Sequence, residues 1–354
     1  MRCDRCKAEY LLAFSCKTRN FCPSCQQKRS VLWAERLVED LLASVSHAQW
    51  VFTIPRALRG LFARDRRLLS LLSQTAYDAI LRVFRAALGE KAARPGVVAS
   101  IQTFADLLHF HPHLHLFVTE GAFLPDGQFL PLPFFSPEPV AEVFRRLLLH
   151  RLHRMERLSD RFLHSLLEWR HSGFNLHNAV RVKPDDPEGT EALARYFTRA
   201  PLSLQKLSLD PATGEVLYHS KFNPRLGRDL ERLDPLEFLA RITSHIPDPR
   251  SHLVRYYGAY SNRARLPRAA SPTCSPPPAR AEKPPSETER RSRASWARLL
   301  RKVFEVDPLL CHRCGSTMRI VAFLTDPRVI DQILTHLARR PASSARAPPA
   351  DPAA

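Results

Sequence analysis

The spacing of apolar residues in the first half of the chain predicts a sheet flanked by helices. Apolar side chains recur at helical spacing in residues 31–45 and 64–88, which predicts two amphipathic helices. Residues 49–54, 97–104 and 113–123 are short runs rich in Val, Ile and Phe, and they predict strands. We expect Pro55 to end the first strand. The order helix, strand, helix, strand, strand predicts an α+β domain, not a helical bundle.

The second half of the chain changes character near residue 267. Before that point, residues 138–171 and 188–199 predict further helices, and residues 175–182 predict a strand. Residues 267–293 hold seven prolines and almost no large apolar residues, which indicates a solvated linker. We therefore expect five parts: a cysteine-rich unit (1–30), the sheet domain (31–266), the linker, a small helical unit (294–340) and a tail that is disordered by composition (341–354).

Charge narrows the class of protein to those that bind a polyanion. The chain has 354 residues, with 53 Lys and Arg against 35 Asp and Glu, which gives a net charge of +18. Nucleic acid is the first candidate partner for such a balance. No apolar run approaches the roughly 20 residues that a membrane helix needs. The opening MRCDRCKAEY has no apolar signal-peptide core. We expect a cytoplasmic protein without a membrane partner.

Three CxxC pairs mark candidate metal ligands, since cysteines without an export signal favour metal binding over disulfides. Fifteen residues lie between the pair Cys3 and Cys6 and the pair Cys22 and Cys25, a spacing typical of one tetrahedral zinc site. The alternative is four free thiols in a basic loop. Lys28 and Arg29 follow the second pair, which favours contact with nucleic acid. The third pair, Cys311 and Cys314, has no obvious partner nearby, so it is half a site completed by another chain or a remnant.

The run HFHPHLHLFV, residues 109–118, predicts a strand that carries a divalent metal ion. Strand side chains alternate, so His113, His115 and Phe117 share one face and the intervening apolar residues bury the other. Two imidazoles so placed can chelate Mg²⁺ or Mn²⁺ if the substrate is a phosphate. A histidine-rich strand without a ligand is the alternative. We expect Pro112 to end the strand. His177 is a candidate third ligand, or equally a structural histidine.

The motifs together resemble a known family. His-hydrophobic-His on a strand, with a tyrosine on a later helix, resembles the HUH endonucleases. More narrowly, the chain is similar to rolling-circle insertion-sequence transposases with an N-terminal zinc-binding domain. The similarity runs from about residue 3 to 266, and rests on the segments CDRCKAEYLLAFSCKTRNFCPSC, VFTIPRALRGLF, FHPHLHLFVTEGAF, ARYFTRAPLSLQKL and DPLEFLARI. It implies an antiparallel sheet flanked by helices, with a ferredoxin- or RRM-like core.

The resemblance also implies a reaction. Tyr196 in ARYFTR matches the nucleophile that attacks a DNA phosphodiester and leaves a 5′-phosphotyrosine, and Arg195 and Arg199 would neutralise phosphate. Ala192 stands where two-tyrosine members carry a second tyrosine. The cluster of Tyr256, Tyr257 and Tyr260 is the alternative source of a nucleophile.

Cofactors and partners follow from the same resemblance. It implies structural Zn²⁺, catalytic Mg²⁺ or Mn²⁺, and single-stranded element ends and target DNA as substrates. The location would be the bacterial nucleoid, with assembly into a homo-oligomer left open. A plasmid or phage replication initiator, or a non-catalytic zinc-dependent DNA-binding protein, are the alternatives.

Overall fold

The computed structural model describes residues 1–9, 20–132, 135–169, 172–223, 227–264, 309–321, 324 and 326–339. It divides into two compact units. The larger unit is Phe14–Ser286, and the smaller one combines Met1–Ala13 with Glu287–Ala354. Within the described residues, no helix is both long and apolar enough to span a membrane. The predicted linker 267–293 and tail 341–354 lie outside the described residues.

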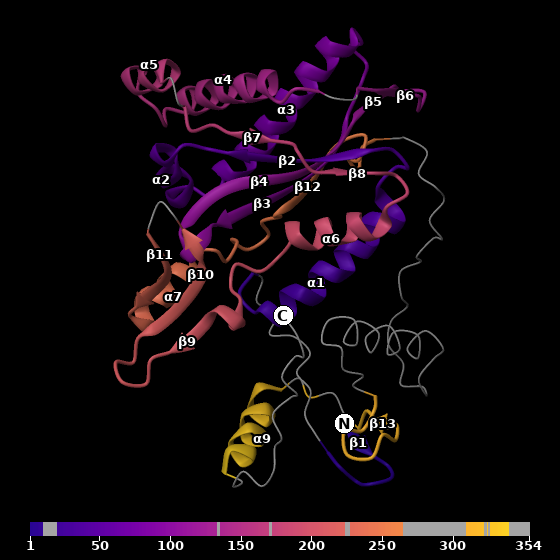
Figure 1. The fold of residues 1–354 in the computed structure, drawn as a ribbon, viewed down its shortest axis with the longest axis vertical. Helices are drawn as coiled ribbons and strands as arrows, with labels where there is room; N and C mark the ends of the chain where they lie inside the picture. The colour runs from indigo at the N-terminus through magenta and orange to yellow at the C-terminus, as the bar shows by residue number, and fades with distance from the viewer. Residues whose placement is uncertain are drawn as a thin grey trace. The chain divides into compact units, whose positions relative to one another are not determined.

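The larger unit is built on a six-stranded antiparallel sheet (Figure 1). Five strands follow the order β12-β3-β4-β2-β7, and β8 also pairs with β2. Their bounds are Val254–Gly258 (β12), Gly96–Phe104 (β3), Phe110–Thr119 (β4), His47–Thr53 (β2), Leu176–His177 (β7) and Arg181–Val182 (β8). The expected α+β class with an antiparallel sheet is confirmed.

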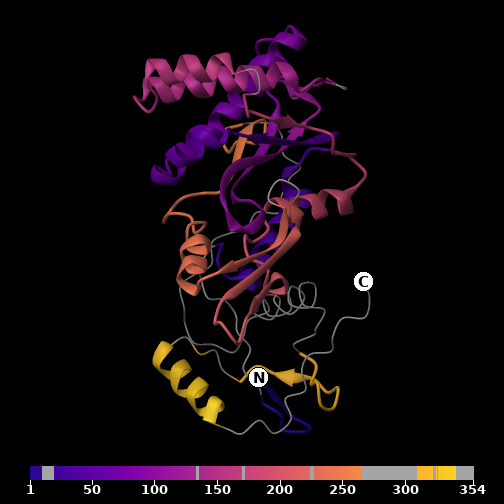
Figure 2. The same cartoon turned by 60° about the vertical axis from the view of Figure 1, so that its left-hand side comes forward.

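Helices cover both faces of this sheet (Figures 1 and 2). One face packs against α2 (Arg56–Arg64), α3 (Leu68–Leu88), α4 (Glu138–Arg154) and α5 (Asp160–Glu168). The opposite face packs against α1 (Pro23–Arg36) and α6 (Pro187–Phe197). Strand β4 is buried on both sides, because Leu114, Leu116 and Val118 enter the first core and Phe117 enters the second. The alternation predicted for this strand is therefore confirmed.

Two local features position α6 and β4. Asp186 caps α6, since its carboxylate accepts a hydrogen bond from the backbone N–H of Gly189 at 2.8 Å, and Pro187 occupies the first turn. Pro112 does not end the strand as expected, because β4 begins at Phe110. The pairing of β4 with β3 is irregular between Gln102 and Phe104, and such an irregularity accommodates a proline without a lost ladder bond.

Other boundaries differ from those expected. The helix predicted from residue 31 begins at Pro23 and continues as a π-helical turn over Leu37–Leu41. Residues 175–182 form the two short strands β7 and β8. A second sheet of β9 (Leu207–Leu209), β10 (Val216–Asn223) and β11 (Arg228–Leu233) packs with α7 (Pro235–Thr243) around its own apolar cluster. A hairpin of β5 (Gly121–Phe123) and β6 (Phe129–Pro131), and the short helices Asp106–Leu108 and Leu204–Lys206, complete the unit.

The smaller unit brings distant parts of the sequence together. Strand β1 (Arg2–Cys3) pairs with β13 (Met318–Arg319), and α9 spans Pro327–Arg339. The two units divide after residue 13, whereas we expected the cysteine-rich unit to end at residue 30. Helix α1 packs extensively on α6 and so belongs with the sheet domain, while the first residues of the chain belong with the C-terminal segment.

Candidate functional site

His113 and His115 lie side by side on β4 and face α6. Their ring centroids are 5.0 Å apart. In the antiparallel register, His113 lies opposite Gln102 of β3 and His115 lies opposite Ser100. Directly opposed side chains in such a pair share a face at close range. The two histidines and Gln102 therefore line one patch of the sheet.

Burial keeps these imidazoles neutral. Desolvation, with a smaller contribution from the nearby Arg199 guanidinium, lowers the pKa of His113 to about 4 and that of His115 to about 3. The Nδ1 atom of His113 lies 2.8 Å from the carbonyl oxygen of His111. A carbonyl only accepts, so Nδ1 carries the proton and Nε2 presents a lone pair. Neutral imidazole with a free Nε2 is the form that binds a metal ion.

His115 presents its Nε2 to the same patch. This atom is buried and has no hydrogen-bond partner among the described residues. The Gln49 Nε2 atom lies 3.2 Å from His115 Nδ1 on the other side of the ring, an arrangement in which the amide N–H donates to Nδ1. An amide flip exchanges the nitrogen and oxygen; with Oε1 toward the ring, Nδ1 would donate to it and leave the Nε2 lone pair for a metal ion.

Gln102 adds an oxygen that the sequence analysis did not identify. Its Nε2 donates to the carbonyl oxygens of Phe197 at 2.8 Å and Tyr196 at 3.3 Å. Both neighbours are acceptors, so the amide orientation is fixed and Oε1 points the other way. Within the described residues, Oε1 is buried without a partner. A buried oxygen that accepts no hydrogen bond and lies opposite His113 is suited to bind a metal ion.

Tyr196 of α6 lies over this patch. Its ring centroid is 5.4 Å from that of His115, with the rings nearly perpendicular, and 42% of the residue is exposed. The guanidinium of Arg199 lies 4.4 Å from the Tyr196 ring centroid. The structure thus brings the predicted tyrosine and histidine pair together, with a cation beside them.

The end of α6 is held from two sides. On one side, the Ser30 hydroxyl of α1 donates to the carbonyl of Arg195 at 3.1 Å and pairs with the Thr198 hydroxyl at 2.7 Å. On the other, the Ser100 hydroxyl of β3 donates to the carbonyl of Phe197 at 2.9 Å. These bonds fix the backbone on either side of Tyr196.

The alternative tyrosines are structural. The Tyr256 hydroxyl accepts from Trp33 Nε1 at 2.9 Å, and the Tyr257 hydroxyl donates to Ser73 at 2.9 Å. Tyr260 pairs with His47 at 2.6 Å. Burial raises the pKa of both Tyr257 and Tyr260, which opposes formation of a phenolate.

The remaining predicted residues of this unit have varied settings. His177 is exposed on β7, and Val51 of β2 separates it from His115, so the structure does not bring His177 to the pair. The Arg195 side chain forms an ion pair with Glu191 at 3.9 Å. Arg29 is exposed on α1, and burial lowers the pKa of Lys28. Arg199 is therefore the predicted cation that lies against Tyr196.

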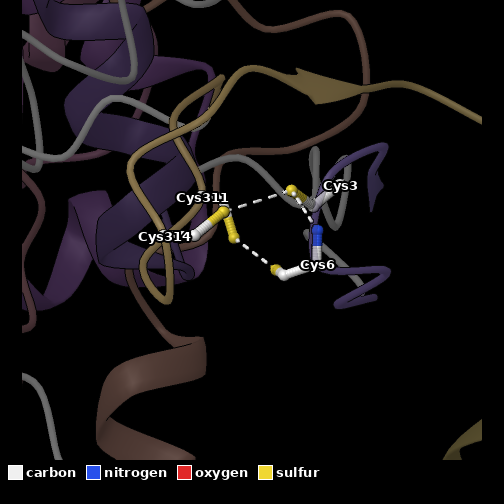
Figure 3. Close-up of side chains that lie close together, drawn as sticks. All are labelled: Cys3, Cys6, Cys311 and Cys314. Carbon is white, nitrogen blue, oxygen red and sulfur yellow. Dashed lines mark hydrogen bonds between the residues drawn. The ribbon is translucent and has the colours of Figure 1, made fainter.

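The cysteine ligands differ from those expected. Cys3 and Cys6 point toward Cys311 and Cys314 (Figure 3), and the four sulfur atoms lie within 4.8 Å of one another. The Sγ atoms are 3.5 Å apart for Cys3 and Cys314, and 3.4 Å apart for Cys6 and Cys311. Among the described residues, this is the only group of three or more His, Cys, Asp or Glu side chains so placed.

The expected partners of Cys3 and Cys6 have a different backbone setting. Cys22 is the N-cap of α1 and Cys25 lies in its first turn, both in the larger unit. The structure therefore groups Cys3 and Cys6 with Cys311 and Cys314, and not with Cys22 and Cys25 as the spacing predicted. Sequence spacing alone suggested it, and spacing does not reveal a contact with a segment 305 residues away.

Four thiols fit a structural zinc ion. Zinc prefers tetrahedral thiolate sites, and two CxxC turns supply that geometry. The Ser316 hydroxyl and backbone N–H lower the pKa of Cys314 to about 6. The backbone at Ala8 favours the Cys6 thiolate, but the hydrogen bond with Cys311 and burial outweigh it and raise the pKa of Cys6 to about 11. Burial opposes ionisation of Cys311, but the N–H groups of Arg313 and Cys314 outweigh it and lower the Cys311 pKa. The cluster supports structural Zn²⁺.

Comparisons with known proteins match two parts of the chain to transposase families. Residues 1–54 match a family described as "Transposase zinc-binding domain", of the IS91 type, and residues 96–267 match a family described as "Putative transposase". The second match contains the histidine strand and the tyrosine helix. No solved structure matches the chain.

Two curated relatives extend the match beyond single domains. The "Transposase for insertion sequence element IS801" of Pseudomonas savastanoi pv. phaseolicola is 26% identical over 327 residues, which cover 86% of this chain and 74% of the relative. The "Putative transposase y4qJ" of Sinorhizobium fredii (strain NBRC 101917 / NGR234) is 30% identical over 281 residues, covering 74% and 70%.

These matches define an insertion-sequence transposase with a zinc-binding domain. The chain belongs to the IS91 family of transposases. The family predicted from the motifs is confirmed.

Proposed function

We propose that this transposase nicks and joins single-stranded DNA ends of a mobile element through a 5′-phosphotyrosine intermediate, as an HUH-type enzyme. The observation that carries the proposal is the position of Tyr196, whose ring lies 5.4 Å from that of His115 on the patch that also holds His113 and Gln102. A nucleophile next to a set of neutral metal-binding side chains is the arrangement that this reaction requires.

His113 Nε2, His115 Nε2 and Gln102 Oε1 would hold the catalytic ion. A bound Mg²⁺ or Mn²⁺ supplies Lewis acidity to the non-bridging oxygens of the scissile phosphate. The donors are two neutral imidazoles and one amide oxygen, so the protein adds no negative charge that would repel a phosphodiester. Gln102 replaces His177 as the proposed third ligand.

The chain's own residues then carry the reaction. The Tyr196 phenol loses its proton to solvent, and its Oη attacks phosphorus to form an O–P bond while the bond from phosphorus to the 3′ oxygen breaks. The leaving 3′ oxygen takes up a proton and becomes a free hydroxyl. Arg199 lies against the Tyr196 ring and stabilises both the phenolate and the phosphate charge. Attack by an incoming 3′ hydroxyl reverses these steps and joins the strands.

Cations near the patch support binding of the DNA backbone. Burial is the main cause of the lowered pKa of His111 and of His113, and the charge of Arg59 of α2 contributes to both. The Nε atom of Arg59 is itself buried without a hydrogen-bond partner among the described residues. Arg66 lies 5.0 Å from the Phe110 ring centroid, at the start of the histidine strand. Arg66 also lines a cavity of about 640 Å³ with Arg64, Arg67 and Arg157. These cationic side chains would bind the backbone phosphates of a DNA strand that leads to the site.

The chain offers one nucleophile at this helix face, because Ala192 occupies the position four residues before Tyr196. Two ends held at once would therefore need two copies of the chain, which favours a homo-oligomer during strand transfer.

A cleavage assay tests the proposal. Labelled single-stranded terminal DNA is incubated with the protein and Mn²⁺, and products are separated on a denaturing gel. The double variant His113→Ala with His115→Ala should lose cleavage and keep its affinity for DNA, because phosphate contacts elsewhere supply most of the binding. His177→Ala is the matched control and should cleave normally. An undiminished rate in the double variant would show that the proposed metal site is wrong.

A further inference from the structure

We infer that one zinc ion, bound by Cys3, Cys6, Cys311 and Cys314, holds together two segments of the chain that lie more than 300 residues apart. The matched zinc-binding domain ends at residue 54 and so does not reach the second pair of ligands. This site is independent of the proposed DNA chemistry, since no residue of the tyrosine and histidine patch takes part in it.

The two CxxC turns have the same backbone structure, as zinc knuckles do. In the first, the N–H of Cys3 donates to the carbonyl of Ala8 at 2.9 Å, and the N–H of Lys7 donates to the carbonyl of Cys3 at 3.0 Å. In the second, the N–H of Cys311 donates to the carbonyl of Ser316 at 2.8 Å, and the N–H of Gly315 to that of Cys311 at 2.8 Å.

The residue after each CxxC also adopts the same conformation. Lys7 has φ of 57° and Gly315 has φ of 67°, both in the left-handed region. A left-handed residue here turns the chain back, so that both sulfurs of the pair face one point. Lysine rarely adopts this conformation, and its presence at Lys7 indicates that the surrounding turn imposes it. The two equivalent turns bring their four cysteine side chains together (Figure 3), which is the number of ligands that a tetrahedral zinc site needs.

The remaining pair, Cys22 and Cys25, lacks this turn. Cys22 begins α1, and the N–H of Gln26 donates to the carbonyl of Cys22 at 3.0 Å, which is a helical bond. Pro23 and the residues after Cys25 continue the helix instead of turning back. The structure thus separates the three pairs into two knuckles and one helix start.

The described core around the cluster is small. Among the described residues of this unit, the buried apolar cluster consists of Cys3, Ala8, Cys311 and Met318, with Met1 and Cys314 against it. The two paired strands, β1 and β13, have two residues each. So small an apolar cluster supplies little folding energy of its own, and a zinc site of four thiolates supplies the rest. Zinc binding therefore decides whether residues 1–9 stay with residues 309–321.

A protease site inserted after Ser275 of the full chain tests the inference. Cleavage produces an N-terminal fragment and a tagged C-terminal fragment. With zinc bound, the tag should recover both fragments, and chelation should reduce recovery of the N-terminal fragment by about tenfold or more. The variant Cys311→Ser with Cys314→Ser should lose one equivalent of zinc and release the N-terminal fragment without chelation. The matched variant Cys22→Ser with Cys25→Ser should keep both the zinc and the association.

Two results would overturn the inference. One is association that persists after zinc removal, which would mean that the metal does not hold the segments together. The other is loss of zinc in the Cys22 and Cys25 variant with full retention in the Cys311 and Cys314 variant, which would place the ion on the four N-terminal cysteines. DNA cleavage is scored in the same samples, so failure of this inference is distinguishable from failure of the proposed reaction.

Discussion

Replacing Gln102 should separate catalysis from stability, because its amide has two distinct roles. The Nε2 donates to two carbonyls of α6, while Oε1 is the proposed metal ligand. In Gln102→Leu both roles are lost with little change in volume. In Gln102→Glu an oxygen ligand remains, but the two donated hydrogen bonds are lost.

The cost in stability should be small. The Phe197 carbonyl keeps its hydrogen bond from the Ser100 hydroxyl at 2.9 Å, and the Tyr196 carbonyl keeps the N–H of Arg199 at 3.4 Å. No acceptor is left unpaired, so the loss in unfolding free energy for Gln102→Leu should be about 1–2 kcal/mol. The cost in catalysis should be larger. Removing a group that only orients a metal ligand lowers metal affinity by about 10- to 100-fold, and losing a ligand should do at least as much.

The assay is single-turnover cleavage over a series of Mn²⁺ concentrations, with unfolding in urea measured in parallel. Gln102→Leu should need far more Mn²⁺ for half-maximal cleavage, and Gln102→Glu should need much less than the leucine variant because a carboxylate binds the ion. DNA affinity without metal should stay unchanged in both. If Gln102→Leu cleaves with the wild-type dependence on Mn²⁺, Gln102 is not a ligand.

Three further predictions concern charge, positioning and pH. With a net charge of +18, binding of single-stranded DNA should weaken with salt, with log K falling against log salt by about 0.7 per phosphate contacted; a flat titration would contradict this. Ser30→Ala should lower unfolding free energy by about 1 kcal/mol and slow adduct formation with unchanged DNA affinity, since the end of α6 loses two of its hydrogen bonds to α1; an unchanged single-turnover rate would rule out a positioning role. Burial lowers the pKa of His47 to about 4 from 6.5, so its contribution to the stability of the metal-free protein is complete above pH 6.5 and is lost as pH falls toward 4. The loss should be roughly 3 kcal/mol, and His47→Gln should show a shallower fall in urea unfolding over that range; an identical fall would refute it.

Much of the patch could be predicted because strand periodicity is local. The alternation of HLHLFV places His113 and His115 on one face whatever the fold around it, and the structure confirms this. The position of Tyr196 followed from the family motif. Gln102, the proposed third ligand, was not predicted, because its position opposite His113 depends on the register of β3 against β4, and register cannot be read from the sequence of either strand alone.

The cysteine ligands show the same limit over a longer range. Spacing predicted a zinc site and correctly included Cys3 and Cys6 among candidate ligands, but it paired them with the neighbouring CxxC. The signal that could have identified the other pair is local similarity: CDRCK and CHRCG each place one residue after the second cysteine in a turn, whereas Pro23 in CPSC is typical of a helix start. Which knuckles meet is a property of the folded chain.

The most direct test of the central claim is to map a trapped covalent adduct between this protein and labelled single-stranded DNA. Digestion and peptide analysis should find the nucleotide on the Tyr196 peptide, and Tyr196→Phe should form no adduct while Tyr256→Phe, the matched control, forms it normally. Because 42% of Tyr196 is exposed, removal of its hydroxyl should change stability by less than about 1 kcal/mol, so loss of the adduct would not reflect unfolding. A nucleotide on the peptide that contains residues 256–260, or an adduct that persists in Tyr196→Phe, would contradict the account.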